Sequence, residues 1–512
     1  MLRRVLMLVL CCGWAGVSAG GGGAVAAEGP SAGLRGGLRA GAAKVDITND
    51  EAGPAHDRLF VRALVIDNGE TKTAIVSVDA VAIGEIGRIG NDYLPGVRQQ
   101  VQQQLGIPGE HVIVNASHCH GVVRADVEQL TVQAIVAAAS KLVPVSVGVG
   151  VGHEDRVSEN RRLIMRDGSQ VDVRHAYSLP PDEQVADVGQ IDPQIGILRI
   201  DTLEGQVLAV LFNFACHPIQ GVPGGANTAD LSGIASSVIE DNLGDSTVAL
   251  FIQGCAGDIN PIDYKDVDHP RHARTLGNML GLSTLQAVRQ IKPQTDERLQ
   301  VVNQRLELPR ADVAQRISDM QVERERLVNS LSGTSLNLKT FLPLIVKYQL
   351  DSDFPSYYSH RYLHDDRLER SDLRHLDAEN RRNLQQYINN IHTMEQLTRL
   401  NTNLALLQKH QADMVDRGSR TIDVELVALR VGEFVLTTFP GELTVQIGLN
   451  IKQASPHAHT FVAGYTNGYI YYAPTSEQLQ NVGGAQEDSD CILAPQWQTL
   501  YENRVKELLE RL

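Results

Sequence analysis

The sequence predicts an α/β fold, with a mixed β-sheet core flanked by helices and a long helical insertion. Two observations support this prediction. From about Ala40 to Ile291, short apolar runs alternate with segments of helical spacing, which is the pattern of an α/β core. Residues 295–420 change character, with two stretches of helical spacing among many charges, and a β pattern returns after Arg420. One discontinuous core domain accounts for both observations.

The N-terminus has the pattern of a secretory signal peptide. Two arginines precede an apolar segment from Val5 to about Val17, and small residues suited to cleavage follow. This segment is too short to span a membrane permanently. We therefore predict a signal peptide over residues 1–27, a Gly/Ala/Ser-rich flexible linker over 28–38, and a secreted or periplasmic protein.

Residues 39–295 are expected to form the first part of the catalytic domain. Strands are predicted at 43–47, 59–66 and 73–78, and the sequence Asp67-Asn68-Gly69 indicates the turn between the last two. Helical spacing over 93–105 ends at a Gly-Ile-Pro-Gly segment.

Residues 296–420 are expected to form the helical insertion. Apolar residues recur at helical spacing from Val313 to Leu331 and again from Leu384 to Leu397, among many charges. Two long helices that pack on each other explain this, with an irregular connection over 351–374. Residues 421–512, which begin with two β-like runs, are expected to complete the catalytic domain.

Composition excludes some classes of function. The chain has 43% apolar and 21% charged residues, as ordinary soluble globular proteins do. A formal net charge of −15 and the lack of a Lys/Arg-dense stretch argue against nucleic-acid binding. Four cysteines remain after the leader (Cys119, Cys216, Cys255 and Cys491), too few for a disulfide scaffold at this length, and core packing is their simplest explanation.

Polar residues follow five predicted strands at the point where each strand ends. In α/β sheets, ligands gather at the carboxyl ends of strands, so these tips are candidates for one shared site. The five tips are His118-Cys-His120, Cys216-His217-Pro218, Gly257-Asp258-Ile-Asn260-Pro261, Pro440-Gly441-Glu442, and the Tyr-rich stretch that follows Tyr465.

The tips together offer a set of ligands for a metal ion. If the strand geometry persists, His118 and His120 project from the same face and present two imidazoles to one divalent cation. Two or three of the histidines His118, His120 and His217, together with Glu442, make a zinc set with one position open. Taken singly, each tip also has a structural explanation, such as a core histidine or turn chemistry, and ligation by Cys119 or Cys216 is an alternative.

These motifs resemble the neutral (non-lysosomal) ceramidases, zinc-dependent amidases that release the fatty acid from ceramide. The similarity runs from about Ala40 to Leu285 and from Thr421 to Thr475, and it includes Asn160-Arg161 and a Tyr469–Thr475 run. It implies zinc ligands at His118, His217, Glu442 and Tyr472. It further implies that His120 is an acid/base or oxyanion partner, that Arg161 binds substrate, and that Asp258 and Asn260 belong to the catalytic segment.

The sequence departs from the ceramidase pattern in several places. The family's catalytic serine precedes the proline of its Gly-Asp-x-Ser-Pro segment, and Asn260 stands there in this chain. The Gly-Pro-rich stretch after His-x-His is replaced by Gly121-Val-Val-Arg-Ala, and Gly483-Gly484 stands where a second tyrosine is expected. The chain ends at Leu512, so the expected match is to the N-terminal catalytic domain without the immunoglobulin-like domain.

The sequence therefore leads to one main hypothesis and two rivals. The main hypothesis is a secreted zinc hydrolase that cleaves an amide bond of ceramide or a related N-acyl lipid with metal-activated water, assisted by His120 and the Asn260 amide. The rivals are a metal hydrolase of the same fold acting on a cell-wall or glycan substrate, and a non-catalytic binding protein. The expected partners are a small-molecule or lipid substrate and a membrane surface in peripheral contact, without nucleic acid or an obligate protein partner.

Overall fold

The structure is a computed structural model that describes residues 37–173, 180, 182–221, 227–265, 272–334, 337, 339, 342–343, 346, 367–369, 372–480 and 485–512. They belong to one compact unit, Gly36–Leu512. The predicted signal peptide, residues 28–36 of the predicted linker, most of the predicted 351–374 connection and Gly483-Gly484 lie outside the described residues.

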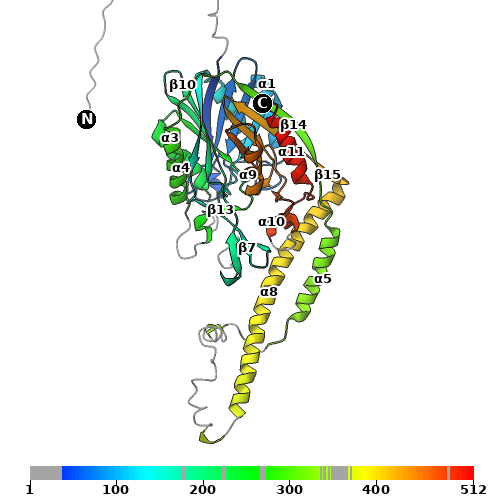
Figure 1. Cartoon of the computed structure of the whole chain (residues 1–512). Coiled ribbons are helices and arrows are strands. Elements are labelled where there is room, and N and C mark those ends of the chain that lie inside the picture. The colour runs from blue at the N-terminus through cyan, green and yellow to red at the C-terminus, as the bar shows by residue number, and fades with distance from the viewer. Residues whose placement is uncertain are drawn as a thin grey trace, which may run out of the picture. The chain divides into compact units, whose positions relative to one another are not determined.

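The first element of the core is an eight-stranded mixed sheet, which confirms the predicted fold class (Figure 1). Its strand order is β12-β11-β10-β5-β1-β2-β3-β4. The strands are β1 (Arg39–Asp46), β2 (Phe60–Asp67), β3 (Lys72–Val78), β4 (Val112–Ala116), β5 (Val143–His153), β10 (Gln194–Thr202), β11 (Val207–Phe214) and β12 (Val248–Gln253). The pairs β3–β4 and β11–β12 are parallel, and the remaining pairs are antiparallel.

This sheet consists of two halves that meet again at their far ends. The halves β1–β4 and β5/β10–β12 are joined by the pairing of Arg39 and Ala40 with the start of β5. On the other side, β12 lies close to β2, β3 and β4. There the Ser77 hydroxyl donates to the Phe251 carbonyl at 2.6 Å. Loops that follow β4 and loops that follow β11 and β12 are thereby brought together.

Period-two alternation in these strands supplies two apolar faces. In β2, Val61, Ala63 and Val65 face one core cluster, whereas Leu64 and Ile66 face another. The first cluster lies between the sheet and four helices. These helices are α1 (Tyr93–Leu105), α2 (Val127–Ala139), α3 (Asp230–Leu243) and α4 (Arg274–Val288).

A second, four-stranded sheet covers the other face of the first. Its order is β14-β15-β16-β18, with bounds Leu299–Pro309, Thr421–Val431, Phe434–Thr438 and Thr460–Ala463. Leu429, Leu436 and Phe461 of this sheet pack in the cluster that contains Leu64 and Ile66. The core is therefore a stack of helices, sheet, sheet and helices, because the outer face of the second sheet is also covered.

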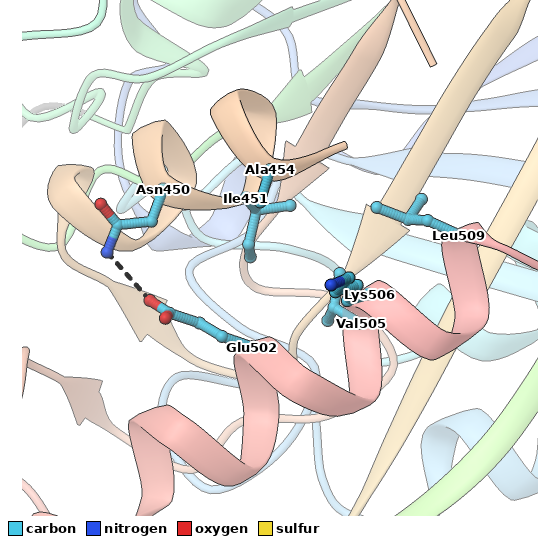
Figure 2. A pocket seen from close by; sticks show the side chains of 7 residues that line it. All are labelled: Asn450, Ile451, Ala454, Glu502, Val505, Lys506 and Leu509. Carbon is cyan, nitrogen blue, oxygen red and sulfur yellow. Dashed lines mark hydrogen bonds between the residues drawn. The ribbon is translucent and has the colours of Figure 1, made fainter. Parts of the chain in front are cut away.

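The outer helices of the stack are α9 (Val445–Ala454) and α11 (Trp497–Leu509). Ile447, Ile451, Val505 and Leu508 pack them against the second sheet. A shallow hollow remains between the two helices (Figure 2). Its rim is tied by Asn450, which donates to Glu502 at 3.0 Å. None of the predicted site residues lines it.

Short strands and turns complete the core. They are β6 (Ser158–Asn160) paired with β13 (Ile259–Pro261), β17 (Glu442–Leu443) paired with β19 (Tyr472–Ala473), and the sheet β8-β7-β9 (Gln170–Asp172, Arg162–Met165, Val185–Val188). The described chain also contains helix α10 (Gln486–Ser489) and the 3₁₀ turns η1 (Asp50–Ala52), η2 (Gly109–His111), η4 (Asp182–Gln184), η6 (Ile262–Lys265) and η7 (Gln478–Gln480).

The insertion contains the two predicted long helices, α5 (Ala314–Ser330) and α8 (Asp372–Arg417), which run side by side (Figure 1). Within the described residues, no helix combines the length and the apolar character needed to cross a membrane. One stretch expected to be helical is a strand. β14 pairs with β15 over eleven residues, from Leu299 to Pro309, because its alternating apolar residues bury Leu306 and Leu308 against α11.

Candidate metal centre

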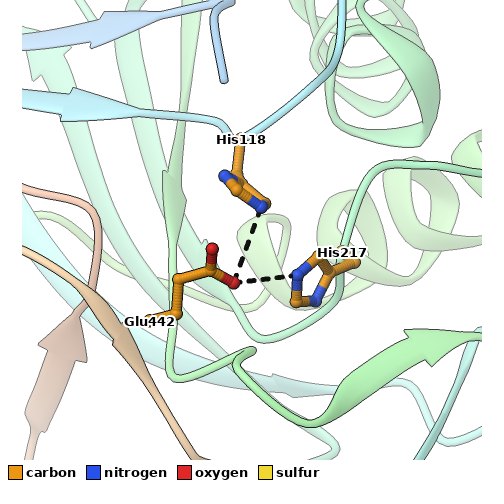
Figure 3. Close-up of side chains that lie close together, drawn as sticks. All are labelled: His118, His217 and Glu442. Atoms are coloured by element: carbon orange, nitrogen blue, oxygen red, sulfur yellow. Dashed lines mark hydrogen bonds and ion pairs between the residues drawn. The ribbon is translucent and has the colours of Figure 1, made fainter. Parts of the chain in front are cut away.

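Three ligand-type side chains converge where strands of the two sheets end. His118 follows β4, His217 follows β11, and Glu442 follows β16 (Figure 3). Nε2 of His217 lies 3.1 Å from Oε2 of Glu442, and Nε2 of His118 lies 3.6 Å from the same oxygen. One ligand atom from each residue falls within 4.8 Å of the others, and all three side chains are buried.

His118 is held by an unusual backbone conformation. β4 ends at Ala116, and His118 has a φ of 67°, in the left-handed region that costs a residue other than glycine or asparagine about 1 kcal/mol or more. Its N–H donates to the Ala80 carbonyl, and its Nδ1 donates to the Val81 carbonyl at 2.6 Å. Because the chain turns here, the assumption that His118 and His120 project from one extended strand is wrong.

His120 lies beside the centre rather than within it. The ring centroids of His118 and His120 are 5.6 Å apart, and the His120 side chain is exposed. Desolvation by the protein atoms around it lowers the pKa of His120, and the nearby His118 lowers it further. At neutral pH its imidazole is therefore an uncharged group able to accept a proton.

His217 is anchored through the segment that contains Asn260. Both the His217 N–H and its Nδ1 donate to the Ile259 carbonyl, each at 3.0 Å. In His118 and His217 alike, Nδ1 faces a carbonyl oxygen, which only accepts. Nδ1 must therefore carry the proton, and the lone pair lies on Nε2, toward Glu442.

The charge state of the two histidines fits a cation-binding centre. Burial lowers the pKa of His118 to about 4 and also lowers the pKa of His217. Two neutral imidazole lone pairs and one carboxylate oxygen thus point at the same small volume. None of these three atoms carries a proton to donate, and imidazole nitrogens and carboxylate oxygens are ligand types that bind Zn²⁺.

Glu442 is fixed by two buried tyrosines. Tyr465 donates its hydroxyl to Oε2 at 3.1 Å, and Tyr469 donates to Oε1. Burial by itself raises the pKa of Glu442, and the hydrogen bond from Tyr469 opposes this because it favours the ionised carboxylate. Burial raises the pKa of both tyrosines well above the usual value, so they remain neutral donors.

Tyr472 and Arg161 lie together next to Glu442. Tyr472 is the strand partner of Glu442 in the β17–β19 pair, and the Arg161 guanidinium carbon is 5.5 Å from the centroid of its ring. Arg161 is almost fully buried. It donates Nε to Glu487 Oε1 at 2.5 Å, Nη2 to the Gly257 carbonyl at 2.5 Å and Nη1 to Asn260 Oδ1 at 3.1 Å.

The segment that carries Asp258 and Asn260 is buried and polar. Asp258 accepts from the Val445 N–H at 2.8 Å and from Asn160 Nδ2 at 3.1 Å, so both of its carboxylate oxygens are engaged. Asn260 is fully buried, and its Nδ2 has no hydrogen-bond partner in the described part of the chain. Because Arg161 occupies Oδ1, the free end of this side chain is its N–H donor end.

The five predicted strand tips therefore meet, but three important residues were missing from the predicted site. Tyr465 and Tyr469 lie at the predicted fifth tip, but no role was predicted for either side chain. Tyr465, with a φ of 51°, shares the left-handed backbone of His118. Glu487 lies in α10, and no sequence pattern distinguishes it from other acidic residues near a helix start. Within the described residues the cysteines are free and buried, as core packing predicts.

Comparisons with known proteins agree with this arrangement at the level of the fold. No model of a known protein family matches the chain. The structure is similar to that of a neutral ceramidase from Pseudomonas aeruginosa, with a TM-score of 0.58, 16% sequence identity and coverage of 93% of this chain and 75% of that one. A ceramidase complexed with C2 gives a TM-score of 0.59, 17% identity, and coverage of 93% and 76%. The predicted resemblance is confirmed to this extent: the chain has the fold of the neutral ceramidases.

Proposed function

We propose that the protein is a zinc-dependent amidohydrolase that cleaves the amide bond of ceramide or of a related N-acyl lipid. One observation carries this proposal. Three acceptor atoms, on His118, His217 and Glu442, converge at the strand ends of a fold shared with ceramidases. Strand ends of this kind are where α/β folds place their ligands.

In this proposal, His118, His217 and Glu442 hold the metal, and Tyr472 supplies a further ligand. A bound Zn²⁺ provides a Lewis acid for a carbonyl oxygen and lowers the pKa of a coordinated water toward neutrality. The carbonyls of Val81 and Ile259 keep the two imidazoles in the tautomer that ligation needs.

The remaining groups position the substrate and move the proton. His120, uncharged and exposed beside the centre, takes a proton from the attacking water and returns it to the leaving amine. The Nδ2 of Asn260 donates to the carbonyl oxygen as negative charge develops on it. Arg161 orients the Asn260 amide through its hydrogen bond to Oδ1. Asp258 holds the segment that carries Asn260 against the start of α9, because it accepts from the Val445 N–H.

The asparagine restricts which mechanism is available. An amide cannot act as a nucleophile or a base, so this proposal has water attack the substrate directly, without an acyl-enzyme on residue 260. Asn260 offers two N–H donors where a serine would offer one hydroxyl donor. The expected substrate therefore needs an acceptor oxygen within hydrogen-bonding distance of Asn260 Nδ2.

We also propose that the protein is exported, on the evidence of the signal-peptide pattern at residues 1–27. An exported enzyme would meet N-acyl lipids at a membrane surface or in shed form. Determining the N-terminal sequence of protein recovered outside the cytoplasm tests this point. A mature chain that begins near residue 20 or 28 is expected, and an intact Met1 would contradict the proposal.

The decisive experiment combines metal analysis with a substrate panel. Wild type, His118→Ala and His217→Ala are purified and their metal content is measured, with the exposed His153→Ala as the matched control. Each is then assayed with N-acylsphingosine, other N-acyl lipids, esters and N-acetylated sugars. We expect metal and N-acyl activity in the wild type and control and loss of both in the two variants.

The other outcomes separate the rival functions. Activity that is confined to sugars or cell-wall fragments would replace the lipid substrate but keep the metal centre. Bound metal without turnover of any substrate would indicate a binding protein. Full metal occupancy in both histidine variants would show that the site is assigned wrongly.

A further inference from the structure

One buried side chain connects the two loops that carry the histidines. Gln253 is the last residue of β12 and is fully buried. Its Nε2 donates to the Ser117 carbonyl at 3.0 Å and to the Cys216 carbonyl at 2.8 Å. Ser117 directly precedes His118, and Cys216 directly precedes His217. A single amide group therefore lies one residue away from both imidazoles.

All the hydrogen-bonding capacity of this amide is used. Both N–H groups of Gln253 Nε2 donate to the two carbonyls. Its Oε1 accepts from the Gly254 N–H at 3.0 Å and from the Cys216 N–H at 3.4 Å. Because each atom is saturated, the orientation of the amide is determined. Water cannot easily replace it at a buried position, and removal would leave two buried carbonyls unpaired.

The bridge spans parts of the sheet that are far apart in strand order. His118 follows β4 at one edge of the eight-stranded sheet, and His217 follows β11 near the other edge. The Gln253 backbone N–H adds a second tie, since it donates to Asn115 Oδ1 at 2.9 Å. Asn115 in turn donates to Gly464 O and Thr466 Oγ1, beside the tip that carries Tyr465.

We propose that Gln253 is a positioning residue that sets the separation of His118 and His217 and thereby the metal affinity of the centre. The inference rests on the metal centre proposed above and assigns a new role to a residue that touches neither ligand. Groups that orient metal ligands from outside typically change metal affinity about 10–100-fold when they are removed. We therefore expect the zinc dissociation constant to rise at least about tenfold when the bridge is lost.

Two substitutions break the bridge in different ways. Gln253→Glu keeps the shape but places a carboxylate oxygen against the carbonyls of Ser117 and Cys216, so both donor bonds are lost. Gln253→Met keeps the volume without adding a charge. It serves as the second variant if the charged side chain prevents folding.

Asn213→Asp is the matched control. Asn213 is also a buried amide at the end of a neighbouring strand, β11, and its Nδ2 also donates to two carbonyls, those of Ile252 and Val462. Neither carbonyl is adjacent to a predicted ligand. Asn213→Asp therefore reproduces the chemical change without touching a histidine loop.

The experiment measures zinc affinity by chelator competition on folded protein, together with the visible spectrum of the cobalt-substituted form and the melting temperature of the apo form. We expect both Gln253 variants to bind zinc at least about tenfold more weakly with an altered cobalt spectrum, and Asn213→Asp to keep both properties while losing stability. Equal zinc affinity in wild type and the Gln253 variants would overturn the inference but leave the metal centre intact.

Two further results would also count against it. If neither Gln253 variant folds while Asn213→Asp does, the amide is needed for the fold and not specifically for the metal centre. If the wild type binds no metal, both this inference and the proposed metal-dependent function fail, which distinguishes that case from a failure of the bridge alone.

Discussion

The candidate metal centre and the helical hairpin α5/α8 are built on opposite principles. At the centre, residues far apart in sequence meet, and His118, His217 and Glu442 are each at most 3% exposed. In the hairpin, contacts are between two adjacent helices, and large apolar residues such as Val322 and Met394 are 66% and 60% exposed. The hairpin meets the core through polar pairs, including His410 with Asp490 at 2.8 Å.

Under the proposed function, this difference separates the part of the chain that would carry the chemistry from the part that would not. The centre exists only when two sheets and their loops are assembled, so its geometry depends on the whole core. The hairpin follows from local spacing and charge. We therefore expect changes at the centre and in the core to have large effects and equivalent changes in the hairpin to have small ones.

The largest expected effect is that of Glu442→Gln. The amide keeps hydrogen-bonding capacity toward Tyr465 and Tyr469 but removes the anionic ligand between two neutral imidazoles. Zinc affinity should fall by more than the roughly 10–100-fold that loss of a supporting group costs, and hydrolysis should become undetectable. Metal analysis after dialysis and the N-acyl assay measure both effects.

Glu323→Gln on α5 is the hairpin counterpart of this substitution. Glu323 is an exposed carboxylate that pairs with Arg326 three residues later. Metal content and activity should equal those of the wild type. If Glu442→Gln and Glu323→Gln changed metal content and activity equally, the contrast between the metal centre and the hairpin would be wrong.

The next effect concerns stability and is expected for Trp497→Ala. Trp497 is fully buried, its ring centroid lies 5.5 Å from that of Phe439, and its Nε1 donates to the Pro474 carbonyl at 3.0 Å. Truncation should lower the free energy of unfolding by about 3–5 kcal/mol. Met394→Ala, in the exposed part of α8, should change it by no more than about 0.5 kcal/mol. Urea denaturation of the two variants tests the pair.

Much of this architecture could be predicted from local patterns. α1 has the predicted bounds, and β2 and β3 differ from theirs by at most one residue at either end, because apolar spacing and flanking turn residues mark these elements clearly. β14 was missed because its apolar residues are divided between two core clusters, with Leu299 in one and Leu306 and Leu308 in the other, and because its pairing partner β15 lies more than a hundred residues away. Pairing over that distance leaves no local signal.

The candidate site divides in the same way. Histidines and a glutamate at strand ends could be recognised from the sequence because those residue types are common ligands. The left-handed turn at His118 could not, since it depends on hydrogen bonds to Ala80 and Val81 from a separate loop. The buried pair of Arg161 and Glu487 joins segments more than three hundred residues apart, so only the folded chain reveals it.

A smaller effect, confined to catalysis, is expected for Asn260→Asp. The substitution keeps the acceptor for Arg161 but replaces the free Nδ2 donors by an oxygen. Loss of one donor to a developing oxyanion typically lowers kcat about 10²–10³-fold. We expect that decrease with zinc content unchanged, measured by steady-state kinetics on metal-loaded protein. An unchanged kcat would remove Asn260 from the proposed mechanism.

The smallest effect on the centre should come from removing the hairpin altogether. β14 and β15 are paired from Leu299↔Val431 to Pro309↔Thr421, and the Arg310 N–H donates to the Arg420 carbonyl at 2.8 Å. The strands therefore already lie at hairpin distance, and replacing residues 312–418 with a short Asn-Gly turn should close them without strain.

Without α5 and α8, the core loses contacts that include the pairs of His410 with Asp490, of Lys409 with Tyr471 and of Arg316 with Ser489 in α10, but no residue of the metal centre. Zinc affinity should then stay within about 0.5 kcal/mol of the wild-type value, because changes at distant sites usually act independently. Tyr471 contacts both Lys409 and Tyr469, and the ring centroids of the two tyrosines are 5.4 Å apart. Loss of Lys409 could therefore be transmitted to the edge of the site, and we expect any kinetic change to be in KM. A large loss of zinc affinity would show that the hairpin, despite its exposed and local construction, is part of what holds the centre together.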